Sequence, residues 1–323
     1  MGLELLYEKK EDSVKILRCF GEMDEIWLPD QIEGLPVAEL GDYIFSEGMR
    51  TEPKGLLWCE NGEDEEISAP PVCGPSLRSV RLPAFLKRLG RYAFYNCDGL
   101  KRLAFPSAIR DIGAGAFNGC RKIEELTVEA DPREKSCLKE ILSELNEMVA
   151  VHYRERGETG EKTLLAELLF PAFYEEAVEN TPARIIDTHW HGSGYKYRQC
   201  FPERKLDLGG YDRLFPYAVA NELPDTCLQL ALNRLKYPLS LTEEAAGQYR
   251  KFLADHGKEL VKRAVQKEDP DLLVLMEEQG LLSEELTAFA TSYAAERGAA
   301  EVGSFLMDYR RRHSGRRKKT FEL

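Results

Sequence analysis

The fold of this chain is decided by residues 77–122, which read LRSVRLPAFLKRLGRYAFYNCDG and then LKRLAFPSAIRDIGAGAFNGCRK. The two 23-residue segments match in register, and a third copy begins at Ile123. The matched pairs are Leu77/Leu100, Val80/Leu103, Leu82/Phe105, Pro83/Pro106, Leu89/Ile112, Gly90/Gly113, Ala93/Ala116, Phe94/Phe117 and Cys97/Cys120. A fixed period of about 20–30 residues is typical of a solenoid, whose units bury their apolar faces only against their neighbours. The sequence therefore predicts stacked coils.

The first six residues of each copy predict a short strand. Val80 and Leu82 alternate with Ser79 and Arg81, so two side chains face a core and two face solvent. Pro83 lacks an N–H group and suits the end of a strand, where the hydrogen-bond ladder stops. The second copy repeats this alternation. We therefore expect neighbouring strands to present their outward side chains as a ladder.

The pattern P-x-x-(L/I)-x-x-(L/I)-G-x-x-A-F-x-x-C resembles the BspA-like, or type 5, leucine-rich repeat. A weaker match covers residues 26–45, where Ile44 stands in place of the usual alanine. Upstream, residues 3–7 and 14–17 predict strands of an N-terminal cap, which would cover the edge of the first repeat. The resemblance spans about residues 1–130. It implies a leucine-rich-repeat solenoid for that part of the chain.

The segments around the repeats carry other patterns. Residues 46–75 are rich in glycine, proline and acidic side chains and predict a long exposed loop. Residues 137–149 place their apolar side chains on one stripe, which predicts a helix that caps the solenoid. Residues 150–153 and 163–170 flank a turn-like segment and predict a hairpin.

From about residue 218 the apolar period becomes helical. Six helices are expected, over residues 223–235, 242–253, 256–266, 271–279, 283–297 and 300–311. Thr242 and Ser283 are suited to cap two of them, and Gly280 and Gly298 to end two. The series resembles a degenerate ankyrin-type array. Because the T-P-L-H signature is missing, generic α-hairpins are an equal alternative.

The expected fold class is α+β, with a short N-terminal leucine-rich-repeat solenoid, a mixed junction and a C-terminal array of α-hairpins. The expected domains are 1–130 for the repeats with their cap, 131–215 for the capping helix and mixed β/loop junction, 216–312 for the helical hairpins and 313–323 for a basic tail.

Composition narrows the function classes. The chain of 323 residues carries a formal net charge of −12, which argues against general nucleic-acid binding. No stretch approaches the roughly 18 apolar residues of a membrane helix, and no signal peptide is visible. We expect a cytoplasmic protein, or a secreted or surface protein if a signal peptide has been removed. Cys97 and Cys120 are expected to be buried thiols, whereas Cys59 and Cys73 could form a disulfide in an oxidising compartment.

The segment 181–195 holds the strongest candidate for chemistry. Asp187, His189 and His191 alternate along a strand, so one face could hold a metal ion with a further ligand. A structural, aromatic-rich junction is the alternative. Ser193 lacks a complete G-x-S-x-G elbow, and nothing orients Cys200 as a nucleophile beside His191. No phosphate-binding loop is present. We expect no catalytic residue and no cofactor.

The function expected from these patterns is a non-catalytic protein–protein interaction scaffold. The proposed partner-binding residues are Ser79, Arg81, Arg102, Glu125 and Thr127 on the repeat strands. The first alternative is a metal protein or enzyme centred on Asp187, His189 and His191. The second is a nucleic-acid contact through the basic tail, which has seven Lys or Arg side chains between Arg310 and Lys319. A frayed, solvated tail after the last helix is the commoner cause of such a composition. No membrane partner is expected.

Overall fold

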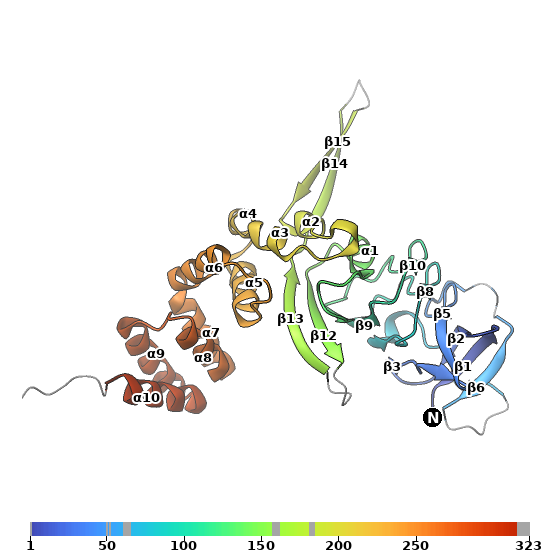
Figure 1. The fold of residues 1–323 in the computed structure, drawn as a ribbon, viewed down its shortest axis with the longest axis horizontal. Coiled ribbons are helices and arrows are strands. Elements are labelled where there is room, and N and C mark those ends of the chain that lie inside the picture. The colour runs from blue at the N-terminus through green and yellow to red at the C-terminus, as the bar shows by residue number, and fades with distance from the viewer. Residues whose placement is uncertain are drawn as a thin grey trace, which may run out of the picture. The chain divides into compact units, whose positions relative to one another are not determined.

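The computed structural model describes residues 2–49, 51, 53–60, 66–156, 162–180 and 185–314, with the backbone alone at residues 156, 162, 178–180, 185–187 and 314. It consists of two compact units, Met1–Cys227 and Leu228–Leu323 (Figure 1). The first unit holds the β-solenoid and a few short helices, and the second is helical. The α+β class predicted from the sequence is confirmed. The finer domain boundaries inside these units stay predictions.

A six-stranded sheet runs along one side of the solenoid. Its strands, in spatial order, are β13 (Lys162–Phe170), β12 (Val149–Arg156), β11 (Glu125–Glu129), β9 (Arg102–Pro106), β7 (Ser79–Arg81) and β3 (Glu25–Trp27). The strands from β3 to β12 are parallel, as stacked coils require, and β12 and β13 form the expected antiparallel hairpin. The parallel sheet therefore ends in a hairpin.

A second sheet runs along the other side of the coils. Its path is β10 (Asp111–Ile112), β8 (Arg88–Leu89), β5 (Leu35–Leu40), β2 (Val14–Phe20), β1 (Glu4–Lys9) and β6 (Leu56–Cys59), and β4 (Gln31–Ile32) pairs with β5. Strands β1 and β2 confirm the predicted N-terminal cap. The prediction of an exposed loop over residues 46–75 was wrong at β6, because the apolar run Leu56–Cys59 pairs with β1 as an edge strand.

The core between the sheets is built from equivalent residues of successive coils. The rings of Phe45, Phe94 and Phe117 stack with centroid distances of 4.9 and 5.2 Å. Cys97 and Cys120 are buried as predicted, and each thiol donates a hydrogen bond to the phenylalanine carbonyl of the preceding coil, at 3.1 and 3.0 Å. A small side chain at this position therefore also links one coil to the next.

The repeated glycine is required by contact between coils. A Cβ atom at Gly90 would lie 2.4 Å from the carbonyl carbon of Gly41, and one at Gly113 would lie 2.3 Å from the backbone nitrogen of Arg91. Gly90 and Gly113 do not have positive φ angles. Close approach of the backbone between coils, and not a left-handed backbone, therefore requires glycine at these two positions.

A short helix and one carboxylate cap the C-terminal end of the coils. Helix α1 (Leu138–Ser143) buries Leu138, Ile141 and Leu142, and it ends earlier than predicted because β12 begins at Val149. In the earlier coils, Phe94 N–H donates to the carbonyl of Ala116 in the next coil. In the last coil, Phe117 N–H donates to Glu144 Oε2 at 2.8 Å. The carboxylate therefore replaces the carbonyl of a missing coil.

The rest of the first unit joins a second hairpin to short helices. Strands β14 (Tyr174–Asn180) and β15 (Ile185–His191) form the hairpin, which extends away from the two sheets in Figure 1. The helices are α2 (Gly194–Tyr197), α3 (Leu208–Arg213), α4 (Phe215–Asn221) and the start of α5 (Pro224–Lys236). Arg198 is 3 % exposed, and burial lowers its pKa to about 10. Its guanidinium donates to the backbone carbonyls of Leu142, Leu145, Glu147, Pro171 and Gly194.

The second unit contains the predicted helices. After α5 these are α6 (Glu243–Asp255), α7 (Gly257–Lys267), α8 (Pro270–Glu278), α9 (Glu284–Arg297) and α10 (Ala300–Ser314). Helix α7 packs against α8 and α9, and α10 packs against α8 and α9, so two helical hairpins stack on each other. Thr242 and Ser283 cap α6 and α9 as predicted. Whether the array is of ankyrin type stays a prediction. Among the described residues, none of the helices has the length and apolar content needed to cross a membrane.

Candidate functional site

The outward side chains of the six-stranded sheet form two rows, which we call the strand face. One row is Glu25, Ser79, Arg102, Glu125 and Ala150, and the other is Trp27, Arg81, Ala104, Thr127 and His152. The alternate residues of the same strands, such as Val80 and Leu126, are buried. The structure therefore brings the five predicted residues of the repeat strands onto one surface, in adjacent register positions. Their role in binding stays a prediction.

The two arginines of the strand face differ in how far they are held within the molecule. Arg81 Nε lies 3.2 Å from Glu129 Oε1, and the side chains of this pair are 22 % and 10 % exposed. Arg102 Nη2 lies 2.5 Å from Glu25 Oε1, and both of these side chains are about half exposed. Arg102 is therefore the arginine that solvent and a partner reach more easily.

His152 extends the face beyond the repeats. Its Nδ1 lies 3.0 Å from Glu125 Oε1, and its Nε2 lies 4.0 Å from Glu167 Oε1 on β13. The hydrogen bond from His152 lowers the pKa of Glu125 and outweighs the opposing effect of burial. The sequence predicted a strand here but not its parallel pairing with β11. His152 was therefore missed as a member of the face.

Trp27 is the most exposed large apolar side chain of the strand face. Its side chain is 71 % exposed, and β3 places it in register with Arg81. Within the described residues, β3 pairs with β7 alone, so it is the edge strand of the sheet. A signal was present in the sequence, because Ile26-Trp27-Leu28 aligns with Val80-Arg81-Leu82. The weak match of the first repeat hid it.

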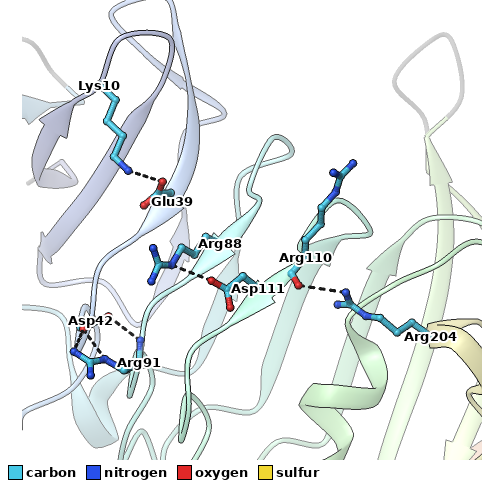
Figure 2. A network of polar contacts seen from close by, with 8 residues as sticks. All are labelled: Lys10, Glu39, Asp42, Arg88, Arg91, Arg110, Asp111 and Arg204. Carbon is cyan, nitrogen blue, oxygen red and sulfur yellow. Dashed lines mark hydrogen bonds and ion pairs between the residues drawn. The ribbon is translucent and has the colours of Figure 1, made fainter.

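The second sheet has an outward ladder of alternating charge (Figure 2). Glu39, Arg88 and Asp111 are in register on β5, β8 and β10, and Arg88 Nε lies 3.1 Å from Asp111 Oδ2. Lys10 Nζ completes the row at 2.5 Å from Glu39 Oε1. Exposed ion pairs of this kind contribute about 0–1 kcal/mol each. This surface was not predicted from the sequence.

Asp42 and Arg91 form a further pair between coils, which Figure 2 also shows. The carboxylate accepts from the Arg91 backbone N–H at 2.9 Å and from its guanidinium at 2.9 and 3.1 Å. Burial raises the pKa of Asp42, but these contacts outweigh it, and the net pKa lies below the ordinary aspartate value. This surface therefore holds the coils in register.

The candidate metal site lies on the β14–β15 hairpin. Strand β15 places His189 opposite Glu176 and His191 opposite Tyr174. His191 Nε2 lies 2.8 Å from Glu176 Oε2, and its ring stacks on Tyr174. The side chain of Asp187 lies outside the described residues. Within the part of the chain that the structure describes, no group of three His, Cys, Asp or Glu side chains could hold a metal ion. The metal alternative stays a prediction.

The remaining candidates take structural positions. Ser193 is buried, and its Oγ donates to Glu222 Oε1 at 2.7 Å. Burial raises the pKa of the Cys200 thiol to about 12, which disfavours the reactive thiolate. Of the basic tail, residues 315–323 lie outside the described range. Arg312, just before it, pairs with Glu277 at 2.7 Å.

Comparison with known proteins identifies the solenoid. Residues 71–146 match the family described as "BspA type Leucine rich repeat region (6 copies)". This region is a BspA-type leucine-rich repeat. It contains all five predicted face residues, whereas Trp27, His152 and Glu167 lie outside the BspA-type region and extend its strand face at both ends.

Two solved structures resemble part of the chain. One is a leucine-rich cell surface protein from Faecalibacterium prausnitzii, with 22 % identity over 38 % of this chain and 31 % of that chain and a TM-score of 0.26. The other is a leucine-rich-repeat protein from T. pallidum, with 22 % identity over 38 % of this chain and 68 % of that chain and a TM-score of 0.19. The chain spans about a third of the first structure. No curated protein matches it.

Proposed function

We propose that the chain is a non-catalytic scaffold that binds a protein partner on the strand face. The observation that carries the proposal is Trp27, which is 71 % exposed and in register with Arg81 on the same surface. Tryptophan and arginine are the residues most often found at the energetic centres of protein interfaces. The BspA-type repeat supports the same class of function, because repeat solenoids present extended surfaces to other proteins.

The shape of the strand face favours a protein over a small ligand. Its two rows cross the five strands from β3 to β12 and include four small side chains, namely Ser79, Ala104, Thr127 and Ala150. Small molecules bind in concave sites, whereas a stable protein interface needs about 800 Å² on each partner. A ladder of short side chains with a tryptophan at one edge suits an extended protein interface better than a concave ligand site. The cytoplasmic location and the lack of catalysis stay predictions.

The test combines one apolar and one charged change on the strand face. The variant Trp27→Ala/Arg102→Gln alters two exposed side chains and no buried one. The matched control is Leu56→Ala/Arg88→Gln, which makes the same kinds of change at exposed positions of the second sheet. Proteins captured from the native cell by the full chain are compared for the three forms, and each candidate is then measured as a purified pair.

We expect a partner whose affinity falls at least about tenfold for the face variant and stays within about twofold for the control. If every partner binds the face variant and the wild type equally, the strand face is not the docking surface. The pair Arg81→Gln/Arg102→Gln is a second test. Because Arg81 forms an ion pair with Glu129, the unfolding free energy of this double variant is measured as well.

A further inference from the structure

Two cations on the second sheet break its alternating charge pattern. Lys87 and Arg110 occupy equivalent positions one coil apart, and Arg110 N–H donates to the carbonyl of Lys87 at 2.9 Å. Both side chains are exposed, and within the described residues neither takes part in an ion pair. Figure 2 shows the Arg110 side chain directed away from the other labelled side chains. Two like charges therefore lie side by side.

A second pair of like charges lies close to the first. Lys135 and Lys205 face each other across an antiparallel β-bridge, and both are exposed. The connection runs through Arg204, whose guanidinium donates to the carbonyls of Arg110 and Ile109 at 3.2 and 3.3 Å. Arg204 itself pairs with Glu140 at 2.8 Å. Lys135 and Lys205 show no ion pair in the described part of the chain. Arg204 therefore links the coil of Arg110, which neighbours Lys87, to the bridge between Lys135 and Lys205.

Two other neighbouring pairs on the solenoid match opposite charges. Lys101 pairs with Glu124 across one coil at 3.0 Å, and Arg88 pairs with Asp111 in the row beside Lys87. The whole chain carries 44 Lys and Arg against 56 Asp and Glu, so negative charge predominates. Like charges placed directly opposite each other on a sheet destabilise it. A group of four such cations therefore has a cost in the free chain that binding of an anionic partner would offset.

We propose that Lys87, Arg110, Lys135 and Lys205, the basic patch, form a docking site for an acidic segment of a partner protein. The guanidinium of Arg110 can donate two parallel hydrogen bonds to one carboxylate. The ammonium groups of the three lysines add electrostatic attraction without a fixed geometry. This surface belongs to the second sheet and its C-terminal end, so the proposal is independent of the strand face.

A short acidic peptide fits the surroundings better than a nucleic acid. The patch is bordered by carboxylates of Asp111, Glu140 and Glu203, all at least partly exposed. A long polyanion such as a nucleic acid would have to pass over these carboxylates and would be repelled by the net negative charge of the protein. A segment with about four carboxylates can match the four cations alone. Charge complementarity therefore selects a short acidic segment.

The experiment uses the full chain and a fluorescent peptide of six consecutive glutamates, with a hexaglutamine peptide as reference. The patch variant is Lys87→Gln/Arg110→Gln/Lys135→Gln/Lys205→Gln. The control, Lys122→Gln/Lys251→Gln/Lys262→Gln/Lys267→Gln, removes the same charge from four exposed lysines that have no ion pair among the described residues. We expect binding of the acidic peptide at about 50 mM salt, at least about tenfold weaker in the patch variant and within about twofold in the control.

Thermal unfolding is measured on the same three proteins. Because the patch variant loses two like-charge pairs, its Tm is expected to equal or exceed that of the wild type. The proposal is overturned if the wild type binds hexaglutamate no better than hexaglutamine, or if both variants lose binding equally. It is also overturned if the patch variant melts below the control, or if a single-stranded oligonucleotide with six phosphates binds the patch more tightly than the acidic peptide.

Discussion

Single residues show that the repeat is selected for contact between coils. A Cβ atom at Gly90 would lie 2.4 to 2.5 Å from backbone atoms of Gly41 and Asp42, which cannot move aside without shifting a coil. Gly247, inside helix α6, has no atom within 4 Å of an added Cβ. The two glycines are therefore matched opposites, one required by packing and one not.

This contrast predicts that alanine at the two positions changes the free energy of unfolding in opposite directions. Gly90→Ala is expected to lower the free energy of unfolding by about 3 kcal/mol, because the added methyl group overpacks the coil contact. Gly247→Ala is expected to raise it by about 0.5–1 kcal/mol, because alanine favours a helix over glycine. Denaturant unfolding measures both. A Gly90→Ala chain as stable as the wild type would show that the coils do not approach this closely.

A second prediction at this scale concerns Glu4, which is 3 % exposed on β1. Burial raises its pKa, but hydrogen bonds from the Ser68 hydroxyl, the Ser68 N–H and the Ala69 N–H outweigh burial and leave the pKa below the ordinary value of 4.5. The folded state therefore favours the ionised form. Its stabilising effect is present above pH 4.5 and is lost as the pH falls through the folded-state pKa.

Unfolding free energies of the wild type and Glu4→Gln, measured from about pH 7 to 3, test this linkage. We expect the difference in stability to be largest near pH 7 and to shrink below pH 4.5. The neutral amide still accepts a hydrogen bond but has no charge to lose. Parallel curves for the two proteins across the whole range would contradict the assignment.

At the scale of elements, the ends of the solenoid depend on side chains that replace a missing coil. Glu144 accepts the Phe117 N–H at 2.8 Å, and Arg204 donates to two carbonyls of the last coil. One carboxylate and one guanidinium thus satisfy one N–H and two C=O groups at the open end. These residues are far apart in sequence and outside the repeat pattern.

The Glu144 cap can be tested by comparing Glu144→Ala with Glu144→Gln. Alanine leaves the buried Phe117 N–H without its acceptor and is expected to cost about 1–3 kcal/mol, whereas glutamine retains an acceptor oxygen and should cost less. Amide hydrogen exchange at Phe117 is expected to accelerate most in Glu144→Ala. Unchanged exchange at Phe117 in both variants would show that the carboxylate is not its acceptor.

The elements that could be predicted from sequence are those with a readable period. Strands β7, β9 and β11 follow the 23-residue repeat, and α5 to α10 follow a helical stripe with caps at Thr242 and Ser283. The helices α2 to α4 are four to seven residues long, too short to display a helical period. Strand β6 pairs with β1 about 50 residues away, and His152 joins the strand face through a similar long-range pairing. No local pattern encodes such partners.

At the scale of the whole molecule, the chain carries a net charge of −12, and the charged residues of the first unit are unevenly distributed. On the strand face, Arg102 pairs with Glu25 and Arg81 pairs with Glu129, and Glu125 is hydrogen-bonded to His152. In the basic patch, by contrast, none of the four cations forms an ion pair with a described residue. The total charge argues against general nucleic-acid binding, which stays a prediction, and it could not reveal a local excess of the opposite sign. That excess depends on which residues the coils bring together.

The eight cysteines give a prediction for the molecule as a whole. All are thiols in the structure. Cys59 and Cys73 are half-buried, and the other six are buried. Burial raises the pKa of the Cys97, Cys137 and Cys200 thiols to about 12. Burial also raises the pKa of the half-buried Cys73. Because the thiolate is the reactive form, an aromatic disulfide reagent at pH 8 is expected to label Cys59 first, Cys73 more slowly, and all eight thiols only after denaturation.

Peptide mapping by mass spectrometry identifies which thiols have reacted. Rapid labelling of Cys97 or Cys120 would contradict the assignment of these two residues to the coil contacts, because both are hydrogen-bonded inside the core. Mapping the protein purified from its native compartment also tests whether Cys59 and Cys73 form a disulfide there. A Cys59–Cys73 disulfide there would indicate an oxidising environment and contradict the predicted cytoplasmic location, since such bonds are rare in the reducing cytosol.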